Sequence, residues 1–125
     1  MKKLIWLLVL LLCSIARGAD AREIIVELTV PDAAWKITID EVHRVGNELW
    51  VISTVSRDAD IMGAQVISKV KDSLVFEASD LPAKHFVIGK SWEWQNQESY
   101  RFIDDMGEIE RELKSGERLY KRNSR

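Results

Sequence analysis

The chain has 125 residues, 18 of them Lys or Arg and 20 of them Asp or Glu, which gives a formal net charge of −2 at pH 7. This length suffices for one domain built around a single hydrophobic core. A chain with an acidic balance lacks the basic surface that phosphate backbones require, so nucleic acid is excluded as the expected partner.

An export signal is expected at the amino terminus. Two lysines precede an unbroken apolar run at 4–12, which is the pattern of a bacterial-type signal peptide. The run is too short to cross a bilayer as a helix, which takes roughly 20 apolar residues. Cleavage after Gly18 or after Ala21 fits the preference for small residues, and we favour the second. We therefore expect residues 1–21 to be removed, the protein to be periplasmic or secreted, and membrane contact to occur only through the signal peptide before cleavage.

Cys13 leaves open a lipoprotein signal, although the bulky Leu12 before it fits that alternative poorly. Residues 22–125 are expected to form a single β-rich domain without cysteine, so neither disulfides nor thiolate zinc ligands are available to it. No metal and no cofactor is expected. This part carries 15 Lys or Arg against 19 Asp or Glu, a net charge of −4, and ends in a basic tail from about residue 116.

The first element expected in this domain is a strand at 23–30. Apolar and polar residues alternate along it, which is typical of a strand with one buried face. The inward-facing set is Ile24, Val26, Leu28 and Val30. Pro31 and Asp32 end the alternation.

A β-hairpin is expected next, with strands at 35–45 and 48–56. They flank Gly46 and Asn47, and glycine at the first loop position suits a type II′ turn. The second strand is apolar on both faces, which predicts a central place in a sheet. The two-residue loop predicts the cross-strand pairs Val42–Val51, His43–Trp50 and Arg44–Leu49.

Three further strands are predicted at 64–70, 74–78 and 84–88. The first two are separated by Lys71-Asp72-Ser73, which we interpret as a turn. The third ends at Gly89.

A second hairpin is predicted at 91–95 and 99–103, folded about Gln97. One register gives two aromatic pairs and one opposite-charge pair, and such pairs contribute roughly 0.2–1 kcal/mol each. The predicted pairs are Trp92–Phe102, Trp94–Tyr100 and Glu93–Arg101.

A short helix is expected at 105–115. Asp105 is the predicted N-cap, with Glu108 in the capping-box position, and Gly116 is the predicted C′ residue. Residues 117–125 are expected to be a loose tail. These elements together predict a mostly β fold, a small antiparallel β-sandwich of immunoglobulin-like type with one short C-terminal helix. A partly open small barrel is the alternative.

The candidate binding residues are Trp92, Trp94, Tyr100 and Arg101. Two indoles on one face could form a stacking platform for a sugar or a peptide, or they could belong to the core. No catalytic residue is assigned. A small hydrolase using His43 or His85 is kept as an alternative, although neither lies in a nucleophile motif.

The preferred function is a protein- or ligand-binding, or inhibitory, module of the bacterial cell envelope, with a protein or glycan partner. A structural or accessory subunit of an envelope assembly is the first alternative. In size and export the chain is similar to the chagasin-type inhibitors of cysteine proteases. Their Asn-Pro-Thr-Thr-Gly loop motif is absent here, so no site residues are transferred from them.

Overall fold

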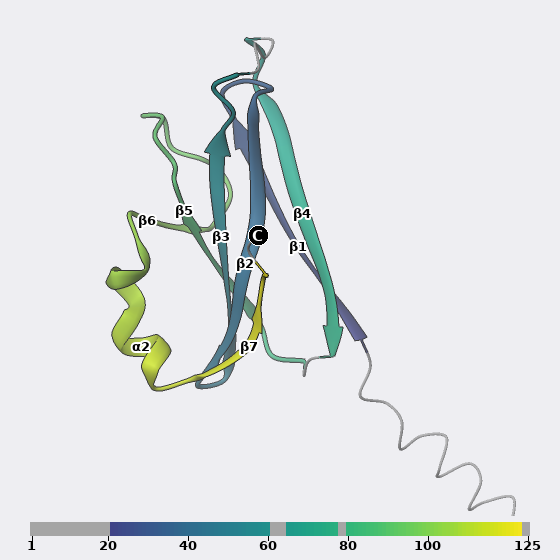
Figure 1. Ribbon diagram of the computed structural model, residues 1–125, viewed down its shortest axis with the longest axis vertical. Helices are drawn as coiled ribbons and strands as arrows, with labels where there is room; N and C mark the ends of the chain where they lie inside the picture. The colour runs from purple at the N-terminus through teal and green to yellow at the C-terminus, as the bar shows by residue number, and fades with distance from the viewer. Residues whose placement is uncertain (1–20, 61–64, 78–79, 124–125) are drawn as a thin grey trace, which may run out of the picture.

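The computed structural model describes residues 21–60, 65–77 and 80–123, which form two β-sheets and one short helical segment (Figure 1). The small sheet contains β1 (Ala21–Val30) and β4 (Ser68–Glu77). The large sheet has the order β6-β5-β3-β2-β7, formed by β2 (Trp35–Val45), β3 (Glu48–Arg57), β5 (Ala83–Ile88), β6 (Arg101–Ile103) and β7 (Glu117–Lys121). The mostly β fold with one short C-terminal helix is therefore confirmed. The predicted signal peptide lies almost wholly outside the described residues.

Strand β1 has the predicted alternation. Its four inward side chains are at most 3% exposed, whereas Ile25 on the opposite face is 49% exposed. It pairs antiparallel with β4 along its whole length, from Ala21 opposite Glu77 to Val30 opposite Ser68.

Strand β4 corrects the prediction of two strands at 64–70 and 74–78. Lys71-Asp72-Ser73 lies inside one continuous strand, opposite residues 25–27 of β1. Ten residues of ladder pairing with β1 override the local turn preference of these polar residues.

The hairpin of β2 and β3 is confirmed, including all three predicted pairs. Gly46 has φ +60° and Asn47 has a negative φ, which is the pattern of a type II′ turn. The register shifts between Ile39 and Glu41, so Asp40 occupies a β-bulge. Strand β3 is central, between β2 and β5, as its apolar sequence predicts.

The predicted hairpin at 91–103 is wrong. Residues 91–100 contain no strand, and β6 pairs parallel with β5, which in turn pairs parallel with β3. Parallel neighbours need a crossover connection of about a dozen residues, and residues 89–100 provide it between β5 and β6. The sheet is thus mixed rather than purely antiparallel.

The predicted helix is present as a 3₁₀ turn, η1 (Met106–Ile109), followed by α2 (Glu110–Lys114). Asp105 caps it by accepting a hydrogen bond from the Gly107 amide at 2.7 Å, as expected for an N-cap. The capping box is displaced by one residue, because Glu108 accepts from the Asp104 amide at 2.6 Å.

The prediction of a loose tail after the helix is wrong for residues 117–121, which form β7 and pair with β2 between Glu41 and Arg44. Position 116 requires glycine because the backbone of β2 lies too close for a side chain, and not because φ is positive there. A Cβ atom there would lie 2.2 Å from the carbonyl oxygen of Arg44.

The sheets pack face to face around one core, and the helical segment covers a second core on the outer face of the large sheet. The first core takes its side chains from β1, β2, β3 and β5. The second contains Trp50, Ile52, Phe86, Ile103 and Ile109. Side chains also join the sheets at their borders: Asp72 of β4 accepts a hydrogen bond from the Ile39 amide of β2 at 2.8 Å.

Candidate functional site

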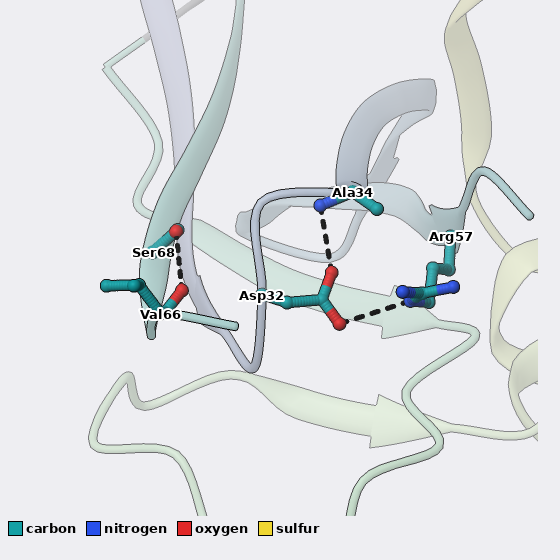
Figure 2. A network of polar contacts seen from close by, with 5 residues as sticks. All are labelled: Asp32, Ala34, Arg57, Val66 and Ser68. Atoms are coloured by element: carbon teal, nitrogen blue, oxygen red, sulfur yellow. Dashed lines mark hydrogen bonds and ion pairs between the residues drawn. The ribbon is translucent and has the colours of Figure 1, made fainter. Parts of the chain in front are cut away.

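Loops gather at one end of the sandwich, where the turn after β1 lies beside the start of β4 (Figure 2). Asp32 accepts hydrogen bonds from the Ala34 amide at 2.8 Å and from Arg57 Nε at 3.1 Å. The Ala34 amide and Arg57 hold the pKa of Asp32 below its ordinary value. Next to this turn Val66 and Ile67 are 62% and 66% exposed. This end therefore combines a braced turn with exposed apolar side chains.

A cluster of three indoles lies at the same end, where β2 begins. The ring centroids of Trp35 and Trp92 are 5.0 Å apart with an interplanar angle of 82°, and those of Trp92 and Trp94 are 5.5 Å apart at 36°. Trp92 Nε1 donates to Asn96 Oδ1 at 2.8 Å. Trp92 and Trp35 are partly buried against the inter-sheet core, whereas Trp94 is 39% exposed. Trp92 thus packs against the core, which was one of the two alternatives, whereas Trp94 lies at the surface.

The crossover segment is attached to the free edge of β1 by its polar side chains. Glu98 Oε2 accepts from the amide and the hydroxyl of Thr29 at 3.1 and 2.8 Å, and Asn96 Nδ2 donates to the Thr29 carbonyl at 2.7 Å. The Tyr100 hydroxyl accepts from the Glu27 amide at 3.2 Å. These bonds satisfy backbone groups of an edge strand without adding another strand.

Glu98 is held as a carboxylate by this arrangement. Desolvation by burial raises its pKa, but hydrogen bonds from Asn96 and Thr29 outweigh it, so the pKa of Glu98 lies below its ordinary value. Its other oxygen, Oε1, accepts from Asn96 Nδ2 at 3.0 Å. Both carboxylate oxygens are therefore occupied by donors of the chain itself.

A pocket of about 290 Å³ opens along this segment. It is lined by Lys90, Gln95, Asn96, Glu98, Tyr100 and Phe102. Lys90 Nζ lies 4.9 Å from the ring centroid of Phe102 and 5.8 Å from that of Trp92, within the range of cation–π attraction. Lys90 therefore links the cavity to Trp92, although the indoles themselves do not line the cavity. We refer to the cavity and the three indoles together as the aromatic pocket.

The structure brings three of the four predicted binding residues to this region. Trp92, Trp94 and Tyr100 belong to the crossover segment. Arg101 does not join them. Its guanidinium carbon lies 5.7 Å from the ring centroid of Phe86, which belongs to the second core, on the outer face of the large sheet.

Sequence reasoning missed Lys90 and Gln95 as lining residues and read the Asn96–Glu98 segment as a hairpin loop. The polar run at 95–98 was the available signal, but its interpretation depended on the wrong hairpin. Lys90 carried no signal at all, since its place beside Phe102 depends on the parallel crossover.

Neither histidine lines the aromatic pocket, although His85 contacts Tyr100, which does. His43 is 7% exposed, and its Nε2 lies 2.6 Å from Glu41 Oε1. The ring of His85 is 4.8 Å from that of Tyr100, and burial lowers the pKa of His85. The hydrolase alternative needs a nucleophilic hydroxyl beside one of these rings. In the described ranges neither ring has a hydrogen bond to a hydroxyl.

Among the residues that the structure describes, no three His, Cys, Asp or Glu side chains come together as a metal site requires. The helical turns of the same residues are too short and too polar to cross a membrane. No protein-family model matches the chain, and no match is found among curated proteins or among solved structures.

Proposed function

We propose that the protein is an exported binding module of the cell envelope that holds its partner at the aromatic pocket. The observation that carries this proposal is the position of Trp94. Its indole is 39% exposed, yet it rests on Trp92, which in turn packs on Trp35. An exposed indole that rests on a second indole offers a ligand an ordered apolar surface to pack against.

The support beneath Trp94 favours binding for an entropic reason. A side chain that is already ordered loses little freedom when a ligand covers it, so more of the contact energy appears as affinity. Tryptophan is also enriched among the residues that dominate binding energy. Trp92 is fixed by its hydrogen bond to Asn96, and Asn96 is fixed to β1 through Thr29. The platform is therefore braced by the sheet itself.

The test compares Trp94→Ala with a matched control, Ile25→Ala. Ile25 is an apolar side chain that is 49% exposed on the outer face of the small sheet, far along the chain from the pocket. Each protein is immobilised and titrated with fractionated envelope material, with peptidoglycan and protein fractions kept apart. We expect saturable binding to one fraction, weakened by more than about tenfold in Trp94→Ala and unchanged in Ile25→Ala. The proposal fails if no fraction binds saturably, or if both variants lose binding equally.

A second candidate, an accessory subunit of an envelope assembly, is favoured by a different surface. Ile25 and Val75 are diagonal neighbours on the outer face of the two-stranded small sheet, and they are 49% and 61% exposed. Sedimentation at micromolar concentration tests this candidate. It predicts an oligomer that Ile25→Lys dissociates, and a wild-type monomer would contradict it.

A further inference from the structure

The free edge of β1 is covered by the crossover segment along only part of its length. In an antiparallel pair the N–H and C=O groups of one residue point to the same side, and that side alternates from residue to residue. The N–H and C=O of Thr29 and the N–H of Glu27 bond to the crossover segment, so both residues point away from β4. The ladder with β4 runs without a bulge, and therefore Ile25 and Glu23 point to the same free edge.

Toward Glu23 this edge presents backbone groups that have no partner. Within the described part of the chain, the N–H and C=O groups of Ile25 and Glu23 accept and donate no hydrogen bond on this side, and neither does the C=O of Glu27. A row of unpaired donors and acceptors along a regular strand is a template to which an extended peptide adds as a further strand.

The other sheet edges of the described residues are less suited to a partner strand. The pairing of β7 is interrupted by a register shift between Arg118 and Tyr120. Strand β6 has three residues, and β4 lies beside β2, where Asp72 accepts from the Ile39 amide. Strand β1, in contrast, is ten residues long and pairs without interruption. Its uncovered part is therefore the most regular edge that the fold offers.

The side chains along this part of the edge indicate the charge of the partner. Glu23 lies on the exposed outer face, diagonal to the exposed Glu77, and neither carboxylate has an ion pair in the described ranges. Lys71 lies opposite Glu27 and balances its charge in part, whereas no basic residue lies opposite Glu23. Arg22 points to the other face, where it donates to a backbone carbonyl at 2.5 Å. The edge therefore has an acidic end at Glu23, which attracts Lys or Arg.

The same charges disfavour a second copy of the chain at this edge. Two β1 strands that pair antiparallel about Ile25 bring Glu23 of each copy opposite Glu27 of the other. Like charges directly opposite each other destabilise a pair of strands. The occupant that fits is thus a different polypeptide with a basic residue at the position opposite Glu23.

We propose that residues 23–27 of β1 bind an extended segment of another protein, which adds antiparallel to β1 and carries Lys or Arg opposite Glu23. Antiparallel pairing is slightly the more stable arrangement, and it lets Ile25 exchange both backbone hydrogen bonds with the residue opposite it. The Tyr100 hydroxyl occupies the Glu27 amide, so the added strand ends there. This surface does not include Trp94, and the inference goes beyond the proposed function.

The test titrates the purified full chain with the capped peptide Thr-Val-Thr-Val-Lys, whose residues favour extended structure, while NMR follows the backbone amides. In the free protein the amides of Ile25 and Glu23 should exchange rapidly with solvent, and those of Ile24 and Val26, which point to β4, slowly. The peptide should shift and protect the first pair and leave the second nearly unchanged. Slow exchange of the Ile25 amide in the dilute free protein would contradict an open edge.

Two control peptides separate the backbone contribution from the charge. N-methylation of the central Thr removes the N–H group that donates to the Ile25 carbonyl, and should abolish saturable binding. Replacement of the terminal Lys with Glu should weaken binding at least about fivefold, with a smaller difference at high salt.

Variants of the protein test the same contacts from the other side. Ile25→Pro removes the amide on the free edge and should lose binding, whereas Ile25→Ala keeps every backbone group and should retain it. Glu23→Lys should reverse the preference between the Lys and Glu peptides, and Glu112→Lys, the same charge change on α2, should not. Thermal unfolding of each variant establishes that it is folded. If Ile25→Pro does not fold, the N-methylated peptide answers the same question.

Three outcomes overturn the inference. The first is equal binding of the N-methylated and the unmodified peptide, and the second is equal binding of the Lys and Glu peptides. The third is protection of the Ile25 amide that rises with protein concentration in the absence of peptide, because it assigns the edge to a second copy of the chain. Trp94→Ala should leave peptide binding unchanged, so failure here leaves the proposal for the aromatic pocket standing, and failure of the envelope titration leaves this inference standing.

Discussion

Replacing Glu98 with glutamine tests whether the crossover segment is held to β1 as the structure shows. In the wild type, Oε2 accepts from the amide and hydroxyl of Thr29, and Oε1 accepts from Asn96. Glutamine has nearly the same shape but exchanges one acceptor oxygen for a donor NH₂ group. Whichever way the amide turns, a donor then faces another donor, at Thr29 or at Asn96.

The magnitude follows from these bonds. A partly buried donor that loses its acceptor costs about 1–3 kcal/mol, and partial exposure of the site to solvent places the loss in the lower half of that range. We expect Glu98→Gln to lower the free energy of unfolding by about 1–2 kcal/mol at pH 7. For a domain of this size each kcal/mol shifts the melting temperature by roughly 4–8 °C.

The effect should depend on pH with a definite sign. The pKa of Glu98 in the folded protein is below its ordinary value of 4.5, so its contribution to the free energy of unfolding is complete above about pH 4.5. That contribution is lost as the pH falls through the lowered folded pKa. The glutamine variant has no such group, so the difference in stability between wild type and variant should shrink in acid.

Urea unfolding at pH 7 and at about pH 3, followed by tryptophan fluorescence, measures both quantities. Glu93→Gln is the control, because Glu93 is an exposed carboxylate of the same segment with no side-chain hydrogen bond in the described residues. The reasoning is refuted if Glu98→Gln and Glu93→Gln are equally stable at pH 7. It is also refuted if the difference between wild type and Glu98→Gln stays constant in acid.

Five other substitutions, at four positions, probe the frame of the fold, each by urea unfolding. Gly89→Ala should cost at least about 2 kcal/mol, since φ is +104° and a Cβ atom would lie 2.2 Å from the Val55 carbonyl oxygen. Gly46→Ala should cost only about 1 kcal/mol, since φ is +60° and no atom would lie within 4 Å of the new Cβ. Equal losses for Gly46→Ala and Gly89→Ala would contradict the close contact between residue 89 and the Val55 carbonyl oxygen. Burial lowers the pKa of His85 below 6.5, so the unfolded chain takes up the proton first and the free energy of unfolding falls as the pH drops through about 6.5. His85→Phe should make the free energy of unfolding less dependent on pH in this range. An unchanged dependence would contradict this role of His85. Asp72→Ala should lower the free energy of unfolding by about 1–2 kcal/mol, because it removes the hydrogen bond from the Ile39 amide. Asp72→Asn keeps an acceptor and should lower it little. Similar losses in the two variants would contradict a contribution from this hydrogen bond.

Local chemistry in the sequence was sufficient wherever strand neighbours are also chain neighbours. The β2–β3 hairpin follows from a two-residue glycine turn, which sets the register of every pair up to the bulge. The inward face of β1 follows from its alternation, and the N-cap role of Asp105 follows from a short-range side-chain preference. None of these features depends on a distant part of the chain.

The incorrect predictions at 71–73 and 117–121 both concern long-range pairing. Lys71-Asp72-Ser73 resembles a turn, but it lies in the middle of β4 because β1 supplies partners for each of its residues. The basic segment at 117–121 resembles a loose tail, but the unpaired edge of β2 accepts it as β7. Both outcomes depend on an available strand edge elsewhere in the fold.

The sequence alone determined that this chain makes strands with a hydrophobic side and one capped helix, because those preferences arise from neighbours within a few residues. It also marked Trp92, Trp94 and Tyr100 as residues of interest. Only the tertiary structure decided which indole is exposed, and that Lys90 and Glu98 share a pocket with Tyr100. The physical reason is that the crossover between two parallel strands is positioned by β1, a strand about 70 residues earlier in the chain, through hydrogen bonds that no local pattern encodes.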